Sequence, residues 1–428
     1  MGTEILERKE RLLLKHGRVI DPSNKTDDYL DLVIENNKIT CVKQNIIPEK
    51  GERVIECEGL YIWPGLIDMH LHIGDLFEIT TQSAFCAAND GVTFAVSPGA
   101  GNTFMAPALL GAEVDRGMPI NIGILLGGQN ILASMLSQDE LVQLFNGELP
   151  QETAFKKLSK NMITNRTAPL ILGIKDHMGH VLMSDENIDQ LFDITERAGL
   201  LYMSHTQDPE HTLRLKELSR GRSFHLGHAN AAGCGTHCDP EEGMKKIVEL
   251  CKSKQITGEF VSSMLRGGLG TREGLKMTPA SQRVAYDALN SGIVDILVSD
   301  GQNQSTMKGF GSTRDNIPCI LELAEKEVLS LMDAVATMTA NPVKLFSKIF
   351  KHSGWLKKIG NLQKDSYANI TIVDPNEKRA VYTIVNGKIS SFDGRILRNY
   401  GNAGYWMCNS GLYPSIGVGE ISLFKREE

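Results

Sequence analysis

The chain has 428 residues and a net charge of -7; 41% of its residues are hydrophobic and 23% are charged. This length allows one large barrel plus a smaller domain, and the composition is that of a folded globular protein rather than a disordered chain. The negative charge argues against nucleic-acid binding, which needs a basic face to displace the counterions of the phosphates.

Signals for a membrane or for secretion are missing from the sequence. No stretch approaches the roughly 18 apolar residues that cross a bilayer, and the charged start MGTEILERKERLLLKHG lacks the apolar run of a signal peptide. The eight cysteines lie mostly among apolar neighbours, which is typical of reduced core residues rather than of a disulfide framework. We therefore expect a cytoplasmic protein that binds neither membranes nor nucleic acid and acts on a small molecule.

Both ends of the chain have the pattern of short β-strands. At the start, LLLKHGRVID, DYLDLVIENNKITCVKQ and RVIECEGLYIWP alternate apolar and polar residues, and Asn36-Asn37 is a hairpin signal. After Pro342 the pattern returns in YANITIVDP and AVYTIVNGKISSFDG. We expect these ends to pair into one small β-sandwich domain, residues 1–65 plus 346–400, followed by a C-terminal extension, 401–428, with no defined role.

Residues 66–345 alternate between apolar strand-like runs and helical patterns. Helical spacing appears within 84–89, 185–197, 240–252 and 281–291. Eight strand candidates occur: GLIDMHLH, VTFAVS, INIGILL, PLILGIK, LLYMSH, SFHLGH, ITGEFVSS and VDILVSD. Eight such strand–helix units predict a (β/α)₈ TIM barrel.

Polar side chains that can bind metals end several of these strands. His70 and His72 end the first strand and, being two apart, point to the same side. The others are Lys175, His205, His228 and Asp300, at the ends of the fourth, fifth, sixth and eighth strands. A single histidine at a strand end is more often a loop residue, and an aspartate there is often a helix cap. Six such groups at the carboxyl-terminal rim, where barrel active sites lie, predict a metal site.

These residues resemble the binuclear amidohydrolase superfamily, nearest in pattern to the dihydroorotases and hydantoinases. The opening PGLIDMHLH is specific, and LKMTPASQRVAYDALNSGIVDILVSD is similar to the region of strands seven and eight in those enzymes. The resemblance covers nearly the whole chain. It implies two divalent ions, Zn²⁺ first and Mn²⁺, Co²⁺ or Ni²⁺ as alternatives. It also implies that CO₂ carboxylates Lys175 to a bridging carbamate, with one ion held by His70, His72 and Asp300 and the other by His205 and His228.

The resemblance further implies a reaction and an assembly. We expect hydrolysis of a C–N bond in a small cyclic amide or an N-acyl or carbamoyl compound by a metal-bridging hydroxide. Asp300 would act as general base and then general acid. A homo-oligomer is also expected from the family.

Two other functions remain open. A metal-dependent deaminase of a heterocyclic base is disfavoured, because that branch typically has HxxE after the fifth strand and no carboxylated lysine. A non-catalytic assembly protein on the same fold is disfavoured because such relatives have lost metal ligands that this chain keeps. The dihydroorotase assignment itself is weakened, since Ile73-Gly74-Asp75 follows HLH where those enzymes usually place an arginine that grips a substrate carboxylate.

Rim loops supply the candidate substrate-binding residues. Asn102 and Arg266 are the best candidates, although a surface role is equally open, and His177 and His180 either contact substrate or belong to a polar loop. Cys234 and Cys238 flank His237 and could hold a separate metal. Because no second ligand pair is visible, we favour an active-site loop there.

Overall fold

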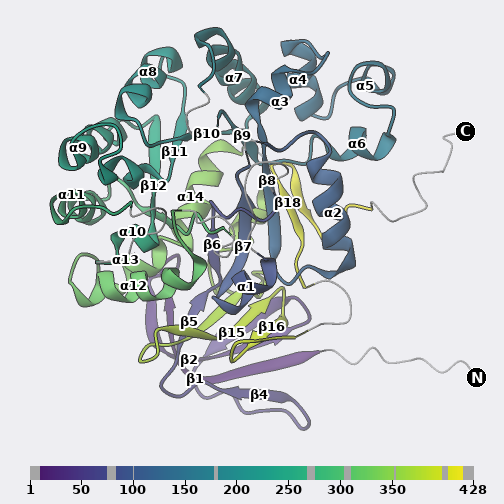
Figure 1. Ribbon diagram of the computed structural model, residues 1–428. Helices are drawn as coiled ribbons and strands as arrows, with labels where there is room; N and C mark the ends of the chain where they lie inside the picture. Colours follow the sequence, from purple (N-terminus) through teal and green to yellow (C-terminus); the bar gives the residue numbers. More distant parts are fainter. Residues whose placement is uncertain are drawn as a thin grey trace, which may run out of the picture.

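The computed structural model combines a barrel with a β domain that lies beneath it in Figure 1. It describes residues 10–74, 83–99, 101–177, 182–267, 275–302, 310–350, 353–397 and 403–417. Among these residues no helix is both long and apolar enough to cross a membrane.

Eight parallel strands form the barrel, and each lies within one of the predicted apolar runs except β8, which extends one residue further, to Gly127. They are β6 (Leu66–Asp68), β7 (Val92–Ser97), β8 (Asn121–Gly127), β9 (Gly173–Lys175), β10 (Leu201–His205), β11 (Phe224–Gly227), β12 (Ile256–Val261) and β13 (Ile296–Val298). Neighbours in sequence pair side by side from β6 to β13. A bridge between Leu71 and Gly301 brings the first and last strands together. The predicted fold class is confirmed.

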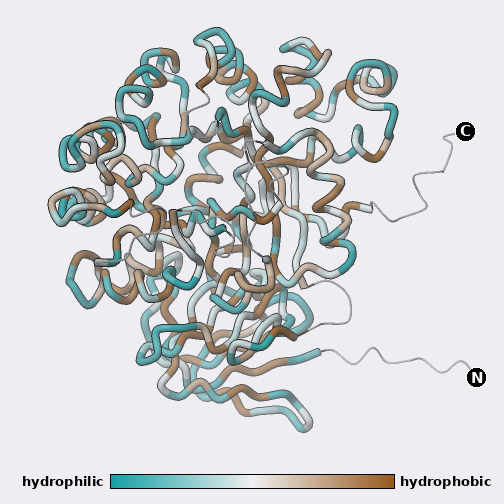
Figure 2. Tube along the Cα trace, viewed as in Figure 1, coloured by the Kyte–Doolittle hydropathy of each residue, from teal (hydrophilic) through white to brown (hydrophobic). Residues whose placement is uncertain are grey.

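The strands are continuous apolar runs because both of their faces are covered. Every residue of β7 and β8 is buried, as expected for parallel strands that helices cover on the outside. Figure 2 shows apolar residues concentrated in the interior strands and polar residues on the outer faces of the helices.

Helices surround the barrel, and the four predicted helical segments lie in α1, α7, α9 and α11. The helices are α1 (Ala84–Asn89), α2 (Ala106–Gly117), α3 (Gly128–Leu132), α4 (Gln138–Phe145), α5 (Gln151–Lys157), α6 (Met162–Thr167), α7 (Asp185–Ala198), α8 (Pro209–Ser219), α9 (Pro240–Cys251), α10 (Ser262–Leu265), α11 (Pro279–Asn290), α12 (Asn316–Glu325), α13 (Leu331–Ala336) and α14 (Ala340–Ile349), with 3₁₀ turns η1 (Ala229–Cys234), η2 (Thr313–Asp315) and η3 (Gly354–Lys358). An Asp-Pro pair begins both α8 and α9: the aspartate caps free backbone N–H groups, and proline suits the first turn.

The two ends of the chain build one mixed sheet, as predicted. Its strands are β1 (Arg11–Asp21), β2 (Thr26–Glu35), β3 (Lys38–Lys43), β4 (Arg53–Glu56), β5 (Tyr61–Pro64), β14 (Ile370–Asp374), β15 (Arg379–Val385), β16 (Lys388–Phe392) and β17 (Arg395–Ile396). Antiparallel pairing of β5 with β14, in which Ile62 faces Ile372, joins the two halves. The domain boundaries drawn from the sequence remain a proposal.

The predicted turn at Asn36-Asn37 joins β2 to β3, and Asn36 adopts the left-handed conformation with φ 55°. It lies against the turn of the β15–β16 hairpin. A Cβ on Gly387 would be 1.8 Å from the Asn36 carbonyl oxygen, so this approach requires glycine.

The described part of the C-terminal extension packs on the barrel. Its hairpin, β18 (Trp406–Cys408) and β19 (Gly411–Tyr413), pairs with β8 through Trp406 and Ile122. The Trp406 side chain is fully buried and donates from Nε1 to the Leu170 carbonyl at 2.9 Å. This segment therefore forms part of the barrel's outer wall.

Candidate metal centre

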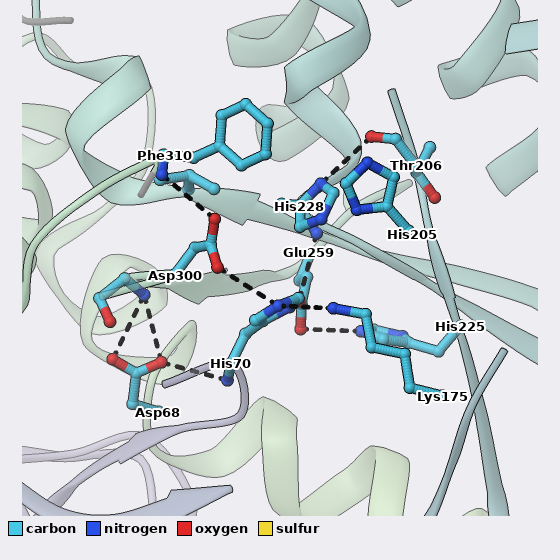
Figure 3. Close-up of polar contacts among 12 residues, drawn as sticks. Asp68, His70, Lys175, His205, Thr206, His225, His228, Glu259, Asp300 and Phe310 are labelled. Atoms are coloured by element: carbon cyan, nitrogen blue, oxygen red, sulfur yellow. Dashed lines mark hydrogen bonds and ion pairs between the residues drawn. The ribbon is translucent and has the colours of Figure 1, made fainter. Parts of the chain in front are cut away.

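Three of the predicted ligands meet at the carboxyl-terminal rim. His70 and His72 follow β6, Asp300 follows β13, and one ligand atom from each lies within 4.8 Å of the others. The Asp300 Oδ1 atom is 3.0 Å from His72 Nε2 and 3.3 Å from His70 Nε2. The opening and closing strands of the barrel thus deliver their polar ends to one point, as Figure 3 shows for His70 and Asp300.

Lys175 reaches the same point from β9. Its Nζ atom is 3.2 Å from His70 Nε2, and the residue is only 4% exposed. Within the described part of the chain, the amine forms no ion pair with a carboxylate. The Lys175 side chain is therefore buried among imidazoles without a carboxylate partner, and a charge in such a place is costly.

His205 and His228 lie on the other side of Lys175. Their ring centroids are 4.4 Å apart, and the His228 ring is 5.1 Å from that of His70. The Nδ1 atom of His228 lies 3.2 Å from the Thr206 carbonyl oxygen and can donate to it. The other ring nitrogen, Nε2, is then left to bind an ion at the centre. A Cβ on Gly227 would lie 3.1 Å from the His70 ring, so a glycine before His228 lets the rings approach closely.

Two of these residues have unusual backbones. His228 has φ 41° and Asp300 φ 47°, in the left-handed region that non-glycine residues seldom adopt. Such strain persists where the surrounding structure over-determines a conformation, and it clusters at functional sites.

Burial sets the protonation of the centre. It lowers the pKa of His228 to about 4 and moves the pKa of His70 and His205 well below the usual value, with the Lys175 charge adding to the effect. Burial opposes ionisation of Asp300, but the hydrogen bond with His72 and nearby positive charges hold its pKa below the ordinary range. Neutral imidazoles and an ionised carboxylate are the states that bind metal ions.

The residues present fit divalent ions. The buried Nε2 atom of His205 has no hydrogen-bond partner in the described part of the chain, an unusual cost for a polar atom that a metal ion would remove. The neighbouring donors are imidazole nitrogens and one carboxylate, which suit Zn²⁺ and similar ions. His70, His72 and Asp300 would hold one ion and His205 and His228 another.

Sequence reasoning missed the groups that orient His70. The Glu259 carboxylate on β12 is fully buried and contacts His70 Nδ1 through Oε1. Its Oε2 lies 3.0 Å from His225 Nε2, and the His228 backbone N–H donates to Oε1 at 3.2 Å. A carboxylate behind a ligating imidazole fixes the orientation of the ring. A charged residue inside the apolar run ITGEFV was the available signal.

Asp68 is a second missed residue, and it joins the two strands that carry ligands. Its carboxylate accepts from the backbone N–H groups of His70 at 3.2 Å and Ser299 at 3.1 Å, and from Asn316 Nδ2 at 3.2 Å. Burial raises its pKa to about 7 against these hydrogen bonds. The residue positions the backbones of β6 and β13 beneath the centre.

The structure separates the substrate-binding candidates. Asn102 is buried, and its side chain donates to the Leu125 carbonyl at 3.2 Å. The Arg266 guanidinium pairs with Asp315 and, at 2.8 Å, with Glu322 Oε1. Both side chains make contacts within the protein, and their roles in substrate binding remain predictions.

His177 does lie beside the centre, with its ring centroid 5.6 Å from that of His205. His180 and Asp75 lie outside the described residues. Cys234 and Cys238 join no metal-binding group within the ranges that the structure describes, whereas His237 between them lines a cavity together with His177.

Known proteins resemble the chain over most of its length. It is 23% identical over 410 residues to a dihydroorotase of Aquifex aeolicus, covering 86% of this chain and 90% of the relative. A dihydroorotase of Clostridioides difficile is 24% identical over 437 residues, covering 93% of this chain and 98% of the relative.

Solved structures support the fold. The dihydropyrimidinase of Brevibacillus agri matches with a TM-score of 0.68 at 17% identity, covering 94% of this chain and 99% of that one. A D-hydantoinase matches with a TM-score of 0.69 at 18% identity, covering 93% and 98%. The model of the amidohydrolase family matches residues 61–392, which is most of the chain. The protein therefore belongs to the amidohydrolase family of C–N hydrolases, as its histidine, lysine and aspartate pattern indicated.

Proposed function

We propose that the protein opens a small cyclic amide by hydrolysis at the rim centre. The observation that carries this proposal is the convergence of His70, His72 and Asp300, with the Lys175 amine in contact with His70. The names of the relatives, dihydroorotase, dihydropyrimidinase and hydantoinase, favour a cyclic amide over the acyclic N-acyl and carbamoyl alternatives.

Asp300 is the proposed proton carrier. When bound, two divalent ions would polarise the scissile carbonyl and lower the pKa of water at the centre. The Asp300 carboxylate would accept a proton as that water adds to the carbonyl carbon, and then deliver it to the leaving nitrogen as the C–N bond breaks. Its lowered pKa supports the first role, because the carboxylate is ionised at neutral pH. His70, His72, His205 and His228 bind and orient the ions.

We propose that Lys175 carries a carbamate. The Lys175 amine is 4% exposed and surrounded by imidazoles; CO₂ would convert it to an anionic carbamate, whose buried charge two bound cations would stabilise. Protein prepared in ¹³C-bicarbonate should show one carbamate carbon signal by NMR that is missing from Lys175→Ala. The variant should also lose most bound metal. Lys156→Ala, on exposed α5, is the matched control. Full metal content and activity in Lys175→Ala would refute the carbamate.

The residues near the centre favour a substrate that has no carboxylate. In particular, the segment that follows HLH offers no arginine to bind one. Ile73-Gly74 occupies the place where dihydroorotases usually carry arginine, and Arg266 is neutralised by two carboxylates. We therefore expect hydantoins and dihydropyrimidines to react faster than dihydroorotate.

A substrate panel tests the function. Metal-replete protein is incubated with hydantoins, dihydropyrimidines, dihydroorotate, lactams and N-acyl amino acids, and ring opening is followed by mass gain of one water. Ammonia release without ring opening from an added amino-substituted heterocyclic base would instead support the deaminase. A fully metallated protein that turns over none of them would support the non-catalytic assembly protein. Location in the cytoplasm and a homo-oligomer remain predictions.

A further inference from the structure

A second group of metal-binding side chains lies beside the centre. Ligand atoms of Asp176, His177 and His211 all fall within 4.8 Å of one another. The three residues are 1%, 2% and 5% exposed. They come from the end of β9 and from α8, and the proposed hydrolysis uses none of them.

Asp176 orients His177. The carboxylate lies 2.7 Å from His177 Nδ1, and it accepts from the Tyr202 hydroxyl and the His205 backbone N–H, each at 3.4 Å. This is the arrangement that holds a ligating imidazole: a carboxylate takes one ring nitrogen and leaves the other for a metal. The His177 and His211 rings meet edge to face, with centroids 4.8 Å apart.

His211 supplies an unsatisfied atom. Its Nε2 is buried and has no hydrogen-bond partner among the residues that the structure describes. On the other side of the ring, Nδ1 has only a 3.4 Å contact with Arg214, whose guanidinium is held more closely by Asp185 and the Met183 carbonyl. Burial lowers the pKa of His211 to about 4, so the ring is neutral and can bind a metal ion.

The side chains of His177 and His211 line a small cavity. Its volume is about 60 Å³, room for an ion and a water, and it is lined by His177, Leu182, His205, Gln207, Asp208, His211 and His237. The Oδ2 atom of Asp208 lies 3.9 Å from His237 Nδ1 across this space. Imidazoles together with the Asp176 and Asp208 carboxylates favour a cation over an anionic ligand, because an anion would meet two negative charges.

We propose that His177 and His211 bind a third divalent transition-metal ion, with Asp176 orienting His177 and with Asp208 and His237 lining the cavity beside it. Two or three imidazoles with a carboxylate select Zn²⁺ or a similar ion over Mg²⁺ or Ca²⁺, which prefer oxygen ligands. The site shares no proposed ligand with the main centre, although His205, which would bind the second ion of that centre, lines the same cavity. It therefore stands whether or not that centre hydrolyses a cyclic amide.

Zinc-edge anomalous scattering from crystals of the full chain, grown with Zn²⁺, tests the position directly. We expect a peak between His177 and His211 in addition to the density at the main centre. Density confined to the main centre would overturn the proposal.

Stoichiometry tests it in solution. Metal per chain is measured by mass spectrometry after desalting, for wild type, His211→Asn and His177→Gln. Each variant should bind one ion fewer per chain than wild type. His211→Cys should bind as many ions as wild type, because a thiolate also ligates zinc. His16→Asn, an exposed histidine paired with Glu56, is the control and should change nothing. Equal metal content in wild type and both variants would refute the site, and circular dichroism confirms that each variant is folded.

A background without the main centre separates the two sites. In His70→Asn/His72→Asn/His228→Asn, which has no hydrolase activity, Zn²⁺ titration against a chelating indicator should still show one bound ion. Adding Asp176→Asn should weaken it about 10–100-fold, the usual effect of removing the partner of a ligating histidine. Loss of all zinc binding in a folded background protein would contradict the proposal.

Discussion

The rim of the barrel and the β domain bury opposite kinds of residues. The rim encloses His70, Lys175, Glu259 and Asp300, each at most 4% exposed. The β domain encloses an aliphatic cluster that includes Ile62 and Ile372, both fully buried. Burying charged and polar groups costs free energy unless they are paired, whereas burying aliphatic side chains stabilises the fold. The difference indicates that the rim is maintained for its chemistry and the β domain for stability.

Asp300→Asn should give the largest loss of activity and should separate the chemistry of the rim from the stability of the fold most clearly. It removes both a proposed ligand and the proposed proton carrier, so kcat/KM should fall by about 10³-fold or more. The Tm of metal-free protein should not fall, because a buried charge is lost. Asp287→Asn, exposed on α11, should leave activity unchanged. A large fall in Tm would mean that the rim also supports the fold.

Ile372→Ala tests the other half of the comparison. Removing this fully buried side chain should lower the free energy of unfolding by about 2–5 kcal/mol, measured by urea denaturation. Metal content and kcat should stay unchanged. The conservative Ile372→Val should cost about 0.5–1.5 kcal/mol. If Ile372→Ala lost metal as well as stability, the two regions would be coupled.

Glu259→Gln tests whether a buried carboxylate at the rim contributes to metal binding by orienting His70. Losing the carboxylate behind His70 should weaken metal binding about 10–100-fold, measured by competition with a chelator. Glu249→Gln, exposed on α9, is the matched control. Unchanged affinity in Glu259→Gln would show that His70 is oriented by packing alone.

Asp90→Asn should give the smallest effect, and one that depends on pH. Burial raises the pKa of Asp90, at the end of α1, to about 6 despite its hydrogen bond with Thr313. A carboxyl whose pKa is higher in the folded protein stabilises it at low pH, and that contribution is lost as pH rises from about 4 to about 6.

Relative to wild type, Asp90→Asn should therefore gain stability across this interval, on the order of 2 kcal/mol in the free energy of unfolding. Urea denaturation at several pH values measures the difference, with Asp287→Asn as the exposed control. A constant difference from pH 4 to pH 7 would show that the Asp90 pKa is not raised.

The sequence determined the barrel strands and the main ligands. Parallel strands covered on both faces must be continuous apolar runs, so β6 to β13 were visible as local patterns. Their carboxyl ends share one rim by topology alone, which is why His70, His72 and Asp300 could be placed together before any coordinates.

Only the tertiary structure decided which side chains face one another across that rim. Glu259 lies behind His70 although 189 positions separate them, and Arg266 forms ion pairs with Asp315 and Glu322. The sequence does not single out His211, and only the packing of α8 brings its ring against His177. Periodicity reports burial along one element, whereas such partnerships depend on how separate elements pack, which no local pattern encodes.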